Sequence, residues 1–217
     1  MTTFEQVRPI ADTVLYEGYV LYPYRADDAK NRVRWQFGVL APRALSEADP
    51  SERSRLRCDL LLEARPERVD VRLRFLQVQR RTVQRRGPGP DGAFETVHQL
   101  DAGDTTYLPF EEAVPHDVDV TARLADLVSG VTGTPRVEPV AVDGGEEIEP
   151  VPGGRLVRER LPLSATVTLS ASPLPGPYGV TRLRVEVDNT TASVPEQPAR
   201  AEALRHSLVA AHLLVRV

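Results

Sequence analysis

The chain has 217 residues, 41% hydrophobic and 27% charged, so it can bury a core without disulfides and is too apolar for a wholly disordered protein. Its one cysteine, Cys58, excludes an internal disulfide, and no stretch approaches the roughly 18 uncharged apolar residues of a membrane span. The first residues have neither the basic nor the apolar region of a secretory signal. We therefore expect a cytoplasmic protein without a membrane partner.

Positive and negative charges lie in separate blocks. Of the basic residues, 26 are arginines and one is a lysine, Lys30, and the net charge is −4. Residues 51–86 contain eleven arginines and five acidic residues, whereas residues 91–150 contain fourteen acidic residues and two arginines. Neighbouring blocks of opposite sign can face each other within one fold, or they can face a partner.

Two apolar segments near the N-terminus predict a β-hairpin. Residues 14–22 are apolar on both alternating faces, which is typical of a strand covered on both sides. Residues 33–40 alternate, and one face carries Val33, Trp35, Phe37 and Val39. The polar run of residues 25–32 between the two segments predicts a long solvated loop.

Further strands are predicted over residues 56–63, 69–83, 94–100 and 114–120, followed by a short helix over residues 122–128. Within residues 69–83 the apolar alternation changes parity after Phe75, which predicts a β-bulge. The polar residues of this strand are expected to share a wetter face, formed by Arg72, Arg74, Gln77 and Gln79.

Residues 129–154 are rich in glycine, proline and acidic residues and show little periodicity, which predicts a long loop or linker. The chain otherwise reads as one β-rich domain over residues 1–217, with a possible weak subdivision at that segment. Residues 161–169 and 183–187 alternate strictly between apolar and polar side chains and therefore predict strands.

The last segment predicts the one convincing helix of the chain, over residues 199–213, because Leu204, Leu208 and Ala211 form an apolar stripe. The apolar end that follows fits a last strand or a chain shorter than its relatives. Together these elements predict a mainly β fold, a β-sandwich or partly open barrel with one C-terminal α-helix packed on it.

No catalytic motif is readable in the chain, which lacks a GxSxG, a Walker A loop and a GxGxxG that joins a strand to a helix. His116, Asp117 and Asp119 are close in sequence, but strand alternation places the histidine on the opposite face from both aspartates. One strand therefore cannot present all three to a single metal ion. Cys58 is expected to be a buried, inert thiol. We expect no metal, no cofactor and a protein that is not an enzyme.

The arginine-rich residues 53–86 allow an alternative in which one sheet face binds the phosphates of a nucleic acid. Against this, the net charge is negative, lysine is nearly absent, and Phe75 is the only aromatic residue in the basic block. We therefore favour a solvated sheet face, or one that pairs with the acidic block, and do not expect a nucleic-acid partner.

An aromatic block beside a charged loop is the strongest candidate for a functional surface. Four of the six tyrosines fall in residues 16–24, where they either fill a core strand or offer a contact platform. Because ordered loops often carry function, we predict a protein-interaction surface formed by Tyr22, Tyr24, Arg25, Asp27, Asp28, Lys30, Asn31, Arg32 and Trp35. The alternative is a small-ligand-binding protein or enzyme, with a pocket between the sheets lined by Tyr22, Arg25 and Trp35.

Residues 15–25 (LYEGYVLYPYR), followed by Lys30, Asn31 and residues 34–38 (RWQFG), are similar to an uncharacterised bacterial family. That family, often actinobacterial, is associated with gene clusters for uptake nickel–iron hydrogenases. Residues 202–212 (EALRHSLVAAH) resemble a second block of the same family. The resemblance carries no catalytic residue. It implies an accessory or scaffold role in hydrogenase expression, assembly or maturation, through contact with hydrogenase subunits or maturation factors.

Overall fold

The computed structural model describes residues 3–20, 38–63, 66–89, 92–128, 134–192 and 199–217. Four helices are described: α1 (Phe4–Val20), α2 (Arg43–Ala48), α3 (Leu124–Val128) and α4 (Arg200–Leu204). The strands are β1 (Arg55–Leu62), β2 (Arg68–Arg86), β3 (Phe94–Val97), β4 (Leu100–Ala102), β5 (Thr105–Tyr107), β6 (Phe110–Arg123), β7 (Arg136–Val142), β8 (Gly145–Val151), β9 (Gly154–Arg160), β10 (Leu163–Pro173), β11 (Thr181–Asn189) and β12 (Val209–Arg216). The predicted mainly β class is confirmed, and none of the described helices is long and apolar enough to cross a membrane.

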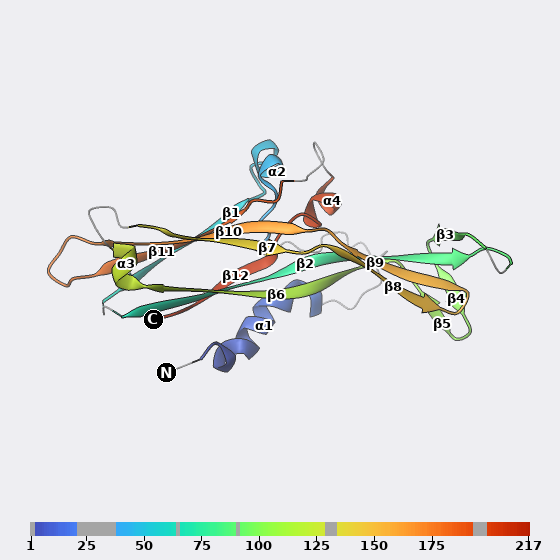
Figure 1. Cartoon of the computed structure of the whole chain (residues 1–217), viewed down its shortest axis with the longest axis horizontal. Helices are drawn as coiled ribbons and strands as arrows, with labels where there is room; N and C mark the ends of the chain where they lie inside the picture. The colour runs from blue at the N-terminus through green and yellow to red at the C-terminus, as the bar shows by residue number, and fades with distance from the viewer. Residues whose placement is uncertain (1–2, 21–37, 64–65, 90–91, 129–133, 193–198) are drawn as a thin grey trace.

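Strand β2 organises the larger sheet and runs along much of the length of the molecule (Figure 1). It pairs with β6 along one edge, and with β12 and then β9 along the other, always antiparallel. At the far end β3 pairs with β2, and β8 pairs with β9. The smaller sheet has the strand order β1-β11-β10-β7 and is also antiparallel.

The two sheets stack on each other through an apolar core. Val167 of β10 and Val185 of β11 pack in the same cluster as Val71 and Leu73 of β2, and all four are fully buried. Along β10 and β11, buried residues alternate with more exposed ones, which confirms the strands predicted from strict alternation. One face of each strand therefore supplies the core, as expected for packed sheets.

A second apolar cluster lies on the other face of β2. Its buried members come from α1, β2, α4 and β12, and they are Leu15, Leu76, Val78, Leu204 and Val209. The pairing of β2 with β6 keeps one continuous register from Arg68 to Arg81, so the predicted β-bulge in β2 is wrong. The apolar parity changes because Phe75 belongs to the core between the sheets, whereas Leu76 belongs to the second cluster.

Residues 14–20, predicted as part of a strand, form the second half of helix α1. Phe4, Val7, Ala11 and Leu15 recur every three or four residues, and Ala11 and Leu15 are buried. When the apolar pattern is followed only from residue 14, the helical spacing of the preceding residues is missed. The apolar run that remains then resembles a buried strand. The rest of the predicted hairpin up to residue 37 lies outside the described residues.

Most of the loop predicted over residues 129–154 is β structure, since it contains β7 and β8. Strand β7 joins the smaller sheet beside β10, and β8 pairs with β9 in the larger sheet. Nearly every residue of β8 is exposed, so its sequence has no apolar alternation that could reveal a strand. Residues 129–133 lie outside the described part of the chain.

The predicted C-terminal helix is also mostly wrong, because α4 ends at Leu204 and β12 follows. The predicted stripe is buried, but against different partners. Leu204 packs in the second cluster, whereas Leu208 and Ala211 pack between the sheets. The chain enters β12 with a positive φ of 51° at Ala210 and a register shift in the pairing with β2. The last strand that was expected as one alternative is therefore confirmed.

Candidate functional site

The predicted interaction surface lies within residues 21–37 and so outside the described residues. It remains a prediction for all nine of its residues: Tyr22, Tyr24, Arg25, Asp27, Asp28, Lys30, Asn31, Arg32 and Trp35. Helix α1 leads directly into this segment, because it ends at Val20. The described element that directly precedes the predicted surface in the sequence is therefore α1, which packs on β2 and β12.

Beneath α1, the basic and acidic blocks of the sequence pair across two neighbouring strands. The register of β2 and β6 sets Arg72 opposite Asp119 and Arg74 opposite Asp117. Arg72 makes a two-pronged ion pair with Asp119, in which Nε donates to Oδ1 at 2.6 Å and Nη2 to Oδ2 at 2.8 Å. The expected pairing of the two charge blocks is therefore found within the fold itself.

Arg74 is the most buried charge of this strand pair, with 2% of its surface exposed. Its Nε donates to Asp117 Oδ1 at 2.8 Å, and its Nη2 donates to Asp12 Oδ1 of α1 at 2.7 Å. Gln77 and Gln79 are buried as well. The prediction that these three residues lie on a more solvent-exposed face of the strand is therefore wrong. Helix α1 covers Arg74, and both glutamines make hydrogen bonds within the fold.

Two polar atoms in this region have no hydrogen-bond partner among the described residues, namely Nη1 of Arg74 and Nε2 of His212. The two residues are direct neighbours across β2 and β12. His212 Nδ1 lies 2.9 Å from the carbonyl oxygen of Ala210, and burial holds the pKa of His212 below its ordinary value. A neutral imidazole that donates from Nδ1 leaves Nε2 as a buried acceptor.

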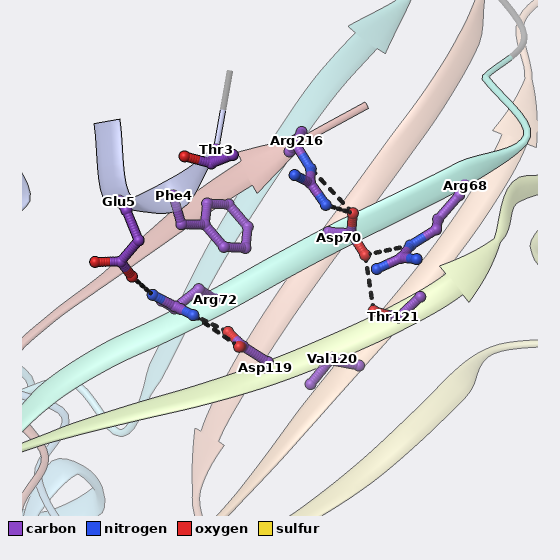
Figure 2. Close-up of a pocket in the computed structure, with 10 residues that line it drawn as sticks. All are labelled: Thr3, Phe4, Glu5, Arg68, Asp70, Arg72, Asp119, Val120, Thr121 and Arg216. Carbon is purple, nitrogen blue, oxygen red and sulfur yellow. Dashed lines mark hydrogen bonds and ion pairs between the residues drawn. The ribbon is translucent and has the colours of Figure 1, made fainter. Parts of the chain in front are cut away.

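Beside the first turn of α1, three strands form a pocket of about 250 Å³ with charged walls (Figure 2). Its deepest charged group is Asp70 of β2, which is buried. Asp70 accepts hydrogen bonds from Arg68 Nε at 2.6 Å, Thr121 Oγ1 at 2.8 Å and Arg216 Nε at 3.0 Å. A buried carboxylate with this many donors is well satisfied, so it acts as a structural link between β2, β6 and β12.

The pKa of Asp70 provides a test of this link. Burial raises the pKa of Asp70, but hydrogen bonds from Arg216, Thr121 and Arg68 outweigh it, so the pKa lies below the ordinary value. A carboxylate whose pKa is lower in the folded state than in the unfolded state stabilises the fold at pH values above its unfolded-state pKa of about 3.9. This contribution is lost as the pH falls through the pKa of the folded state.

We therefore expect the free energy of unfolding to fall on acidification below about pH 4. Asp70→Asn should be less stable at neutral pH and should lose less further stability on acidification, as measured by urea denaturation across this range. Glu147→Gln, on the exposed strand β8, is the matched control. An Asp70→Asn protein with the same acid sensitivity as the wild type would contradict the assignment.

The pocket is closed on one side by the first two residues of α1. The guanidinium carbon of Arg72 lies 4.9 Å from the centre of the Phe4 ring, and that of Arg216 lies 5.5 Å from it. Glu5 Oε1 accepts a hydrogen bond from Arg72 Nη1 at 3.1 Å (Figure 2). Hydrogen bonds from Arg8 and then Arg72 hold the pKa of Glu5 below its ordinary value.

An apolar groove runs between α1 and β12, with a volume of about 480 Å³. Helix α1 contributes Val7, Ile10 and Val14, and β12 contributes Leu213 and Val215. Ile10 is 71% exposed and Val14 is 45% exposed, although both are large and apolar. An open groove with this lining can hold apolar side chains of a second protein.

The other residues considered from the sequence have structural surroundings. The ring of His116 stacks on Phe75 with centroids 5.3 Å apart, and its Nε2 lies 3.0 Å from Gln77 Oε1. Asp117 points to the opposite face, toward Arg74, which confirms the predicted separation. No group of three or more metal-ligating side chains occurs among the described residues. Cys58 is a free thiol on β1 and is half-buried rather than fully buried.

The pocket predicted between the sheets remains untested. Its three expected lining residues, Tyr22, Arg25 and Trp35, lie outside the described residues. Within the described part, the space between the sheets is occupied by buried side chains such as Val71, Leu73 and Phe75, each at most 1% exposed.

The two segments compared with a family from their sequence, residues 15–38 and 202–212, contact each other at two places among the described residues. Leu15 of the first block packs in one cluster with Leu204 of the second. Gly38, the last residue of the first block, accepts a hydrogen bond from the backbone N–H of Ala211 at 2.9 Å. Gly38 has a φ of +57°, and a Cβ there would lie 2.9 Å from the Ala211 carbonyl oxygen, so the contact requires glycine.

Comparison with known proteins adds no relative to this picture. No protein-family model matches the chain, and no curated protein matches it. The case for a function therefore rests on the site around α1 and on the resemblance of the two blocks.

Proposed function

We propose that this protein is a non-catalytic accessory protein that acts in the cytoplasm in the assembly or maturation of a nickel–iron hydrogenase. It binds a hydrogenase subunit or a maturation factor by protein–protein contact. The observation that carries the proposal is the contact between the two segments that resemble the family, through Leu15 and Leu204 and through Gly38 and Ala211.

The surface around α1 supports binding of a protein. The apolar groove is open, and two of the large apolar residues that line it, Ile10 and Val14, are exposed side by side on α1. Exposed apolar residues that cluster in this way can mark a site of protein–protein contact. The groove is lined by α1, and α1 directly precedes residues 21–37 in the sequence. Apolar centres with polar surroundings are typical of protein interfaces.

The charged groups near the groove support a structural rather than a catalytic role. Arg72, Arg74 and Asp70 are each held by ion pairs to residues of neighbouring strands. A catalytic acid or base needs a group that can exchange a proton near neutral pH, and a carboxylate with a lowered pKa paired to an arginine does not provide one. These groups are better suited to fixing the strands on which the groove is built.

The process is tested in a strain that carries the chain beside a hydrogenase gene cluster. Deletion of the gene is expected to reduce hydrogenase activity, and a tagged chain is expected to co-purify with a hydrogenase subunit or maturation factor. Full activity in the deletion strain, with no hydrogenase protein in the purified material, would overturn the proposal.

The surface is tested by placing a charge on it. Ile10→Asp and Val14→Asp should each reduce recovery of the partner at least about tenfold, because an apolar contact is replaced by a buried charge, while the unfolding transition stays unchanged. Tyr178→Asp is the matched control, since Tyr178 is also a large exposed residue and lies in the β10–β11 connection away from α1. Equal recovery with all three variants would mean that the partner binds elsewhere.

A further inference from the structure

The two halves of helix α1 are attached to the sheet by different kinds of contact. The second half is fixed by burial, because Ala11 and Leu15 are at most 3% exposed. It is also fixed by Asp12, which bonds to the buried Arg74. The first turn carries Phe4 and Glu5, which contact the sheet through guanidinium groups. The Glu5 side chain is 61% exposed, so water and salt compete for its ion pair.

A proline separates the two halves. Pro9 lies inside α1 and has no backbone N–H, so it cannot donate the helical hydrogen bond to the carbonyl of Glu5. Its ring also crowds that carbonyl, which bends or weakens a helix at this point. The first turn is therefore connected to the rest of α1 less firmly than one turn of an unbroken helix would be.

The sheet surface under the first turn does not depend on that turn. Arg72 keeps its two hydrogen bonds to Asp119, and Asp70 keeps those from Arg68, Thr121 and Arg216 (Figure 2). Exposing such mutually paired charges to water has a small cost compared with exposing an apolar core. The second half of α1 covers an apolar cluster, so its release would have the larger cost of exposing apolar side chains to water.

We propose that the first turn of α1 is a releasable clasp, which detaches from Arg72 and Arg216 about Pro9 while Leu15 holds the second half of the helix in place. Release removes the Glu5 hydrogen bond from Arg72 Nη1, which keeps only a longer ion pair of 3.7 Å with Asp117 Oδ2 and can then bind a carboxylate of another molecule. Release also opens the end of the groove that Phe4 and Val7 line. The consequence for a partner rests on the proposed function, whereas the motion itself does not.

The clasp is tested by the reactivity of single thiols in a Cys58→Ser background. Val7→Cys reports on the first turn, and Ala11→Cys reports on the second half one helical turn later. Raising NaCl from about 0.02 M to about 0.5 M should speed labelling of the Val7→Cys protein about threefold, because salt screens the Glu5–Arg72 pair. Labelling of the Ala11→Cys protein should be slower and insensitive to salt.

Two further substitutions separate the clasp from general loosening. Glu5→Gln should speed labelling at Val7→Cys about threefold and remove its salt dependence, while Glu47→Gln, which breaks an exposed pair with Arg43 on α2, should have no effect. Pro9→Ala should restore the helical hydrogen bond and slow labelling at Val7→Cys toward the rate at Ala11→Cys.

The proposal is overturned if both positions label at one rate with one salt response, since α1 then moves as a single body. It is also overturned if Pro9→Ala leaves the Val7→Cys rate unchanged. Neither result would bear on whether the protein binds a hydrogenase component, which the co-purification experiment measures separately.

Discussion

Leu76→Ala is expected to destabilise the protein as much as Leu73→Ala, by about 3 kcal/mol in each case. The two leucines lie three positions apart on β2 and so point to opposite faces of the sheet, yet both are fully buried. Leu73 belongs to the core between the sheets, and Leu76 belongs to the cluster with Leu15. A sheet with one solvated face would make one of the two substitutions nearly neutral.

Urea denaturation at neutral pH measures both effects, with Leu61→Ala as the control. Leu61 is also a strand leucine, but it is 66% exposed, so its removal should change the free energy of unfolding by less than about 0.5 kcal/mol. A Leu76→Ala protein as stable as the wild type would mean that α1 and α4 do not cover this face of β2.

Asp117→Ala is expected to destabilise the protein by about 3 kcal/mol, whereas Asp119→Ala should cost about 1 kcal/mol. The two aspartates lie on the same face of β6, but their partners differ in burial. Arg74 is almost completely buried and would keep only Asp12, so part of its charge would be left without compensation. The side chain of Arg72 is 17% exposed, so water can replace part of what Asp119 provides.

A double substitution distinguishes the cost of a stranded charge from the value of the ion pair. Adding Arg74→Met to Asp117→Ala removes the buried charge along with its partner, and stability should recover by at least about 2 kcal/mol. Urea denaturation curves of the wild type, Asp117→Ala, Arg74→Met and the double variant give this comparison directly. If the double variant is less stable than Asp117→Ala alone, the buried arginine is not the source of the loss.

The sequence predicted the strands well wherever one face of a strand is buried and the other is not. Strands β6, β10 and β11 alternate in this way, and each was expected within a few residues of its position. The pattern missed β8, which is exposed on both sides. It found the strand over residues 69–83, which is β2, but it assigned the faces of β2 wrongly because part of this strand is buried on both sides.

The interaction surface predicted from the tyrosines and charges near the N-terminus stays a prediction, because its nine residues lie outside the described part of the chain. The helical spacing of Phe4, Val7, Ala11 and Leu15 was overlooked. That spacing was readable in the sequence and would have revealed the face that α1 packs on the sheet. The ion pairs of Asp12 with Arg74 and of Glu5 with Arg72 were not readable, because their partners lie more than sixty positions apart.

By itself, the sequence determined the mainly β class, the positions of the alternating strands and the opposite charges of the two blocks. These are local properties, since the side-chain period of a strand and the sign of a charge do not depend on the rest of the fold. The tertiary structure alone decided which face of β2 each element covers, which arginine is buried, and that Gly38 meets Ala211. Those outcomes depend on which distant segments pack together, and packing brings neighbours that no window of the sequence contains.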